Sequence, residues 1–89
     1  MLTIKYKKAF EKDARLARKR GKDLNKLKEV IQLLVAEQSL PLKYRDHALV
    51  GKYAHHRECH IEPNWLLIYK QEGNTLILER IGTHADLFK

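Results

Sequence analysis

The 89-residue chain contains little of what membrane insertion or disulfide stabilisation requires. Cys59 is its only cysteine, so no disulfide can form within the chain, a pattern that fits a reducing compartment. The longest apolar run covers residues 65–69, which is far too short to cross a bilayer. The first residues also contain no apolar segment typical of a signal peptide. We therefore expect a cytoplasmic protein that does not associate with membranes.

Several common catalytic motifs are also missing. The chain has no glycine-rich phosphate loop, no serine nucleophile elbow and no paired-carboxylate site. Histidine and cysteine are crowded only at residues 55–60, and there Cys59 and His60 would point to opposite faces of a strand. Because no second pair of ligands accompanies them, we expect no metal and no cofactor.

The basic charge lies almost entirely in the first half of the chain. Residues 1–45 contain 13 basic and 5 acidic side chains, a net charge of +8, whereas residues 46–89 carry −1. This asymmetry favours a nucleic acid or an anionic membrane surface as partner, and the alternative is a solvated basic face that only aids solubility. A chain of this length has room for one hydrophobic core, so residues 1–89 should form a single domain.

The hydrophobic pattern predicts an α+β domain. Apolar residues recur at helical spacing in two segments that end near Gly21 and before Pro41, and the second half alternates as short strands joined by turns. The expected order is β-α-α-β-β-β-β, with two N-terminal helices packed on a mostly antiparallel sheet of four to five strands. The expected strands cover residues 2–6, 49–53, 56–62, 65–71 and 75–82, and the tail can add one helical turn.

Three histidines border or lie within the expected strands. His47, His60 and His84 precede, lie within and follow them, so a compact meander would bring their imidazoles together. Histidine exchanges protons near neutral pH, which suits general acid–base catalysis. The alternative is that each is an ordinary surface or core histidine.

Arg80 interrupts an otherwise apolar strand and therefore needs an anionic partner. That partner is either a carboxylate of Glu58, Glu62 or Glu79, or a phosphate of the substrate.

Two aromatic residues also have two possible roles, in the core or in substrate binding. Trp65 follows a Pro-Asn turn and Phe88 lies next to the end of the chain, and each either packs in the core or stacks on a base. Imidazoles, a guanidinium and aromatic planes beside a basic surface suit metal-independent RNA cleavage. In that reaction the 2′-OH attacks, two groups move protons and a cation stabilises the transition state.

With these residues in place, the sequence resembles the YafQ branch of the RelE/ParE superfamily of bacterial toxins. The resemblance covers nearly the whole chain. Its landmarks are residues 19–27, 40–41, 46–49, 57–65 (Arg-Glu-Cys-His-Ile-Glu-Pro-Asn-Trp) and 79–88 (Glu-Arg-Ile-Gly-Thr-His-Ala-Asp-Leu-Phe).

This resemblance implies a RelE-like fold and a toxin of a type II toxin–antitoxin system that cleaves mRNA in the A site of the 70S ribosome. It implies catalytic roles for His47, His60, His84, Arg80 and Asn64, and substrate binding by Trp65, Phe88 and Lys52. Asn64 departs from the family, whose members usually carry aspartate there, and an amide cannot accept a proton as a carboxylate does.

The resemblance also implies a cognate DinJ-like antitoxin, through which any contact with operator DNA would be made. An acidic antitoxin suits a basic toxin. The alternative reading is a non-cleaving or weakly active member whose main role is to bind nucleic acid or the antitoxin.

Overall fold

The computed structural model describes residues 1–88, which form one five-stranded sheet and three α-helices. The strands are ordered β1-β5-β4-β3-β2, and only β1 runs parallel to its neighbour. The elements are β1 (Thr3–Tyr6), α1 (Lys8–Lys19), α2 (Leu24–Val35), β2 (His47–Ala48), β3 (Arg57–Glu62), β4 (Trp65–Glu72), β5 (Thr75–Gly82) and α3 (His84–Leu87), with short 3-10 turns η1 (Leu42–Tyr44) and η2 (Gly51–Tyr53). The α+β prediction is confirmed.

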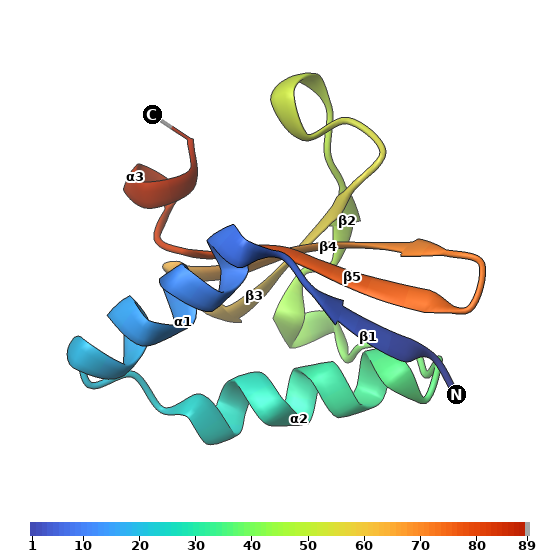
Figure 1. Ribbon diagram of the computed structural model, residues 1–89, viewed down its shortest axis with the longest axis horizontal. Coiled ribbons are helices and arrows are strands. Elements are labelled where there is room, and N and C mark those ends of the chain that lie inside the picture. The colour runs from blue at the N-terminus through green and yellow to red at the C-terminus, as the bar shows by residue number, and fades with distance from the viewer. Residues whose placement is uncertain (89) are drawn as a thin grey trace.

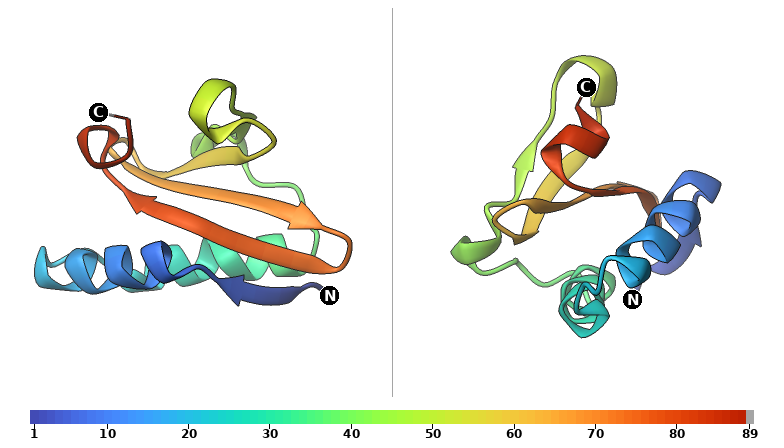
Figure 2. Two further views of the ribbon diagram at one scale, coloured as in Figure 1. Left: turned by 45° about the horizontal axis from the view of Figure 1, so that its top comes forward. Right: turned by 90° about the vertical axis from the view of Figure 1, so that its left-hand side faces the viewer.

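The two long helices cover one face of the sheet (Figures 1 and 2). Each is amphipathic, and α2 begins at Asp23, whose carboxylate accepts a hydrogen bond from the Asn25 backbone N–H at 3.0 Å. Gly21 lies between them with φ +75°, a conformation that favours glycine at the end of a helix. The main core lies between these helices and the sheet, with Val30, Leu67 and Leu78 fully buried.

The opposite face of the sheet carries α3 and the segment that contains η2 (Figure 2). A smaller apolar cluster lies here, in which Leu87 of α3 packs with Tyr53, Leu66 and Ile68. This cluster holds the short C-terminal helix against the sheet.

The strand expected at residues 49–53 is wrong. The ladder of β2 covers only His47 and Ala48, and the chain then turns through η2. The reason is local: Gly51 has φ +73°, in the left-handed region that a strand cannot use. Among the residues described, no helix is long and apolar enough to cross a membrane.

Candidate active site

Six aromatic side chains form a continuous row on the face of the sheet that carries α3. Their ring centroids follow one another at 5.8–6.3 Å. The order of the row is His47, His60, His84, Phe88, Tyr53 and His56. The fold thus brings together the three histidines that the sequence singled out, although the first and the last are 37 positions apart in the chain.

A buried carboxylate joins the first two histidines. Glu58 is only 4% exposed, and its Oε1 lies 3.3 Å from His47 Nε2 and 3.2 Å from His60 Nε2. Glu58 and His60 share one face of β3 because side chains two apart in a strand point the same way, and His47 is the register partner of Glu58 on β2. A carboxylate only accepts protons, so this contact favours a proton on each Nε2.

The second nitrogen distinguishes these two histidines. His47 Nδ1 donates to the Arg45 backbone oxygen at 2.8 Å and its Nε2 faces Glu58, so both of its nitrogens face acceptors. His60 Nδ1 has no hydrogen-bond partner within residues 1–88. It is therefore the nitrogen of this pair that remains open to a substrate.

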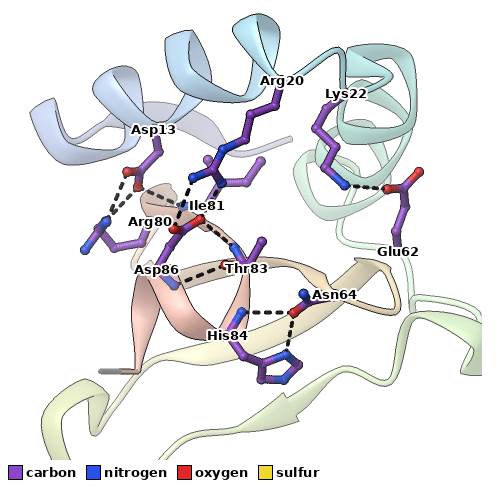
Figure 3. A network of polar contacts seen from close by, with 10 residues as sticks. All are labelled: Asp13, Arg20, Lys22, Glu62, Asn64, Arg80, Ile81, Thr83, His84 and Asp86. Carbon is purple, nitrogen blue, oxygen red and sulfur yellow. Dashed lines mark hydrogen bonds and ion pairs between the residues drawn. The ribbon is translucent and has the colours of Figure 1, made fainter.

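Asn64 fixes the third histidine (Figure 3). Its Oδ1 lies 3.1 Å from the His84 backbone nitrogen and 2.8 Å from His84 Nδ1. A backbone N–H can only donate, so the contacting atom of Asn64 is its oxygen, and His84 Nδ1 must then carry a proton. Nε2 is left as the free nitrogen of His84.

The helix that carries His84 is anchored at its start. Thr83 and Asp86 form a capping box, with the Asp86 backbone N–H donating to Thr83 Oγ1 and the Thr83 N–H donating to Asp86 Oδ2. Arg20, which directly follows α1, donates to Asp86 Oδ2 at 2.7 Å. The Arg20 and Thr83 hydrogen bonds hold the pKa of Asp86 well below its ordinary value.

Arg80 finds a partner that the sequence did not indicate. Its Nε and Nη2 donate to the two carboxylate oxygens of Asp13 at 2.6 and 3.0 Å, and the Ile81 backbone N–H donates to the same carboxylate (Figure 3). The hydrogen bonds to Asp13 raise the pKa of Arg80 above its ordinary value. The partners expected from the sequence, Glu58, Glu62 and Glu79, are wrong, because α1 lies against β5 and brings Asp13 within reach.

The predicted substrate-binding residues separate into two groups. Trp65 is 1% exposed in the core beneath the helices, so its ring is not open to a base in this conformation. Phe88 is 43% exposed and meets Tyr53 edge-on with ring centroids 5.8 Å apart. Lys52 places Nζ 5.5 Å from the Tyr53 ring centroid. Phe88 and Lys52 therefore lie at the far end of the row from His47.

The metal ligands considered in the sequence do not come together. Cys59 is fully buried on the helix side of the sheet, and burial raises the pKa of its thiol above the ordinary range. A different set, His47, Glu58 and His60, offers ligand atoms that all lie within 4.8 Å of one another. Two imidazoles and a carboxylate are donors that suit a divalent transition metal.

Sequence reasoning missed three residues of this region. Glu58 could have been found, because a glutamate two positions before His60 on one strand must share its face. Asp13 and Tyr53 left no such signal, since their contacts join segments far apart in the chain.

Known proteins resemble this chain over nearly its whole length. A family model described as "Bacterial toxin of type II toxin-antitoxin system, YafQ" matches residues 2–89. The mRNA interferase toxin YafQ of Escherichia coli strain K12 is 48% identical over 86 residues, which cover 96% of this chain and 94% of that protein.

Solved structures give the same likeness. YafQ in the crystal structure of the E. coli DinJ–YafQ complex superposes with a TM-score of 0.92 at 46% identity, with both chains fully covered. A metal-bound toxin from Helicobacter pylori gives a TM-score of 0.93 at 46% identity, covering 99% of this chain and 100% of that one.

Proposed function

Since the chain belongs to the YafQ family of toxins from bacterial type II toxin–antitoxin systems, we propose that it is an endoribonuclease that cleaves mRNA in the A site of the ribosome. The observation that carries this proposal is the pairing of two histidines whose rings lie 5.8 Å apart, each with one nitrogen held and one free. Cleavage through the 2′-OH needs one proton acceptor and one proton donor on either side of a phosphate.

His60 is the proposed general base. Glu58 faces its Nε2 and stabilises the imidazolium that forms when Nδ1 takes the proton of the 2′-OH. Burial of Glu58 in the sheet strengthens this electrostatic effect, because little water screens it.

His47 is proposed to act through Glu58. Both of its nitrogens are engaged, so it positions the carboxylate rather than moving a proton.

His84 is the proposed general acid. The Asn64 oxygen holds Nδ1–H, so a protonated His84 presents Nε2–H to the departing 5′-oxygen. Its side chain is exposed, so a substrate can reach it. Phe88, whose ring lies next to that of His84, offers a face on which the neighbouring base can stack.

Arg80 is proposed to stabilise the negative charge that builds on the phosphate. Asp13 uses Nε and Nη2, which leaves Nη1 of the guanidinium for a phosphate oxygen. Because two hydrogen bonds already hold the Arg80 side chain, it would lose little conformational entropy on binding substrate.

No step of this mechanism requires a metal ion. His47, Glu58 and His60 nevertheless have donors that fit one, and a bound ion would supply Lewis acidity at that place. In the mechanism proposed here these three side chains act as proton-transfer and charge-stabilising groups instead.

The basic surface of α1 is proposed to bind ribosomal RNA. Lys8, Lys12, Arg15 and Lys19 recur at helical spacing and are all exposed. Such a row suits a phosphate backbone and adds affinity without sequence preference.

The cognate partner is proposed to be a DinJ-like antitoxin, as in the complex of the E. coli relative. An acidic antitoxin segment would be attracted by the basic surface, and operator DNA would be bound through the antitoxin.

The 3′ end of the cleaved mRNA tests the reaction. Purified toxin is added to 70S ribosomes stalled on a defined mRNA, and the cut is mapped with the chemistry of its ends. Attack by the 2′-OH leaves a 2′,3′-cyclic phosphate, whereas a hydrolytic route with activated water can leave a 3′-OH and a 5′-phosphate. His84→Ala is the control and should lower the rate by about 10²- to 10⁴-fold, as expected for a proton-transfer group.

The second candidate is a family member that binds its partners but cleaves weakly. The specific observation in its favour is Asn64, an amide at the position where the family resemblance implies an aspartate. Ribosome binding by the wild type with no cut above the His84→Ala background would favour this alternative.

A further inference from the structure

A basic hollow opens beside the proposed general base. It has a volume of about 190 Å³ and is lined by Lys43, Arg45, His60 and Pro63. The first two side chains come from η1 and the residue that follows it, and η1 packs on β3, the strand that carries His60.

Both cations of this hollow lack a carboxylate partner. Lys43 and Arg45 form no ion pair within residues 1–88, and no acidic side chain lines the hollow. Arg20, Arg57 and Arg80, by contrast, are each engaged by an aspartate. Two unpaired cations that converge on one hollow next to a histidine form a site for an anion.

The backbone ties this hollow to the catalytic row. Arg45 has φ +49° and ψ +44°, a left-handed conformation that is uncommon for an arginine. This conformation ends η1, and the Arg45 carbonyl accepts the hydrogen bond from His47 Nδ1. Strained backbone of this kind is found mainly where function requires it. Lys43 is positioned as well, with Nζ 5.1 Å from the centroid of the buried Tyr44 ring.

We propose that this hollow binds the RNA phosphate adjacent to the scissile one, on the side of His60 away from Phe88. The proposal rests on the proposed function, because it places the scissile phosphate between His60 and His84. The strand of RNA would then cross the row with one base near Phe88 and the next phosphate held by Lys43 and Arg45. A second hollow of about 310 Å³, which shares Lys43 and Pro63 with the first, offers room for the sugar that follows.

A scan of neutralised phosphates tests this subsite. A 2′-O-methyl oligonucleotide that carries a mapped cleavage site cannot be cut, and its phosphates are replaced one at a time by uncharged methylphosphonates. Each oligonucleotide is placed in the A site of 70S ribosomes, and binding of labelled toxin is measured by fluorescence anisotropy. We expect wild-type toxin to lose affinity at the scissile phosphate and at one adjacent phosphate, by about five- to thirtyfold each.

The variant Lys43→Gln/Arg45→Asn should lose the sensitivity at the adjacent phosphate and keep it at the scissile one. Asparagine tolerates the left-handed conformation of residue 45, so the His47 contact is retained. Lys5→Gln/Lys28→Gln removes the same charge from exposed positions outside the hollow and should keep both sensitivities. Circular dichroism and thermal unfolding check that all three proteins fold alike.

The outcomes separate the two proposals. An unchanged scan in Lys43→Gln/Arg45→Asn overturns the subsite and leaves the catalytic assignment standing. If neutralising any single phosphate leaves the affinity of the wild-type toxin unchanged, the proposed RNA site is wrong, and so is the subsite. An equal loss in both double variants assigns the effect to net charge and also overturns the subsite.

Discussion

The Asn64 side-chain oxygen lies 2.8 Å from His84 Nδ1, and it accepts the backbone N–H of the same residue at 3.1 Å. Because both the backbone nitrogen and Nδ1 of His84 contact this one oxygen, the position of the imidazole is fixed, and Nδ1 is the nitrogen that carries the proton. The amide thus reproduces the orienting effect of a carboxylate without its negative charge. The activity of this chain should therefore show whether orientation of His84 is sufficient or whether a negative charge at residue 64 is also required.

The first prediction concerns Asn64→Asp. A carboxylate at the same place keeps the Nδ1 contact and adds a negative charge. This charge stabilises the protonated imidazole, so His84 should stay protonated up to a higher pH. If His84 is the general acid, the alkaline side of the pH–rate profile should move up by about one pH unit, and the rate near neutral pH should stay the same or rise. Single-turnover cleavage on 70S ribosomes between pH 6 and 9 measures both.

Asn64→Ala is the matched control, since it removes the acceptor and should lower the rate by about tenfold or more. A large loss in Asn64→Asp would contradict the assignment and show that the amide has a role of its own.

The fold was more predictable from the sequence than the contacts of its site. The apolar stripe of α2 predicted this helix because amphipathic spacing can be recognised without tertiary information. The stripe consists of Leu24, Leu27, Ile31 and Leu34. The strand at residues 49–53 failed because the conformation of Gly51 outweighed the apolar pattern. The Arg80 partner was missed because Asp13 lies 67 positions away, and nothing in local spacing reports how α1 is laid against β5.

The second prediction concerns Glu58→Gln. The glutamine keeps the size of the side chain and removes the charge that both His47 and His60 face at 3.2–3.3 Å. The imidazolium of His60 loses its stabilisation, so single-turnover cleavage should fall by about 100-fold. Binding to ribosomes should change less than twofold, because the carboxylate is buried and does not reach the RNA.

Glu79→Gln provides the comparison. Glu79 also faces a histidine, with His56 Nε2 3.0 Å from its Oε1, but that pair lies at the other end of the aromatic row. Cleavage should remain within about twofold of the wild type. Equal losses in the two glutamine variants would show that any His–Glu pair of the sheet matters only for stability.

The third prediction concerns the anchor of α3. The Arg20 hydrogen bond and the Thr83 N–H depress the pKa of Asp86 in the folded state, so its stabilisation is present above the unfolded carboxyl pKa of about 3.9 and is lost as the pH falls below it. Asp86→Asn should lower the free energy of unfolding by about 1 kcal/mol at pH 7, since the ion pair is partly exposed to solvent. Urea unfolding at pH 7 and pH 3 measures the difference.

That difference should shrink at pH 3, because the Asp86 carboxyl of the unfolded chain is then mostly protonated, whereas the folded carboxyl stays ionised. Cleavage by Asp86→Asn at pH 7 should also fall, because α3 carries His84 and is directly followed by Phe88. A stability difference that is the same at both pH values would show that the charge of Asp86 contributes nothing.

The fourth prediction concerns the salt dependence of ribosome binding. Lys12 and Lys19 lie on the exposed surface of α1, and each phosphate contact proposed for them would release counterions. Lys12→Gln/Lys19→Gln should therefore reduce the slope of log K against log salt concentration by about 1.5, and the loss of affinity should be largest at low salt. Filter binding of 70S ribosomes between 50 and 200 mM KCl, at constant Mg²⁺, measures the slope. The control variant Lys5→Gln/Lys28→Gln has the same net charge as Lys12→Gln/Lys19→Gln and should keep the wild-type slope. If both double variants lose slope equally, ribosome affinity follows net charge, and α1 is not the surface that binds the RNA.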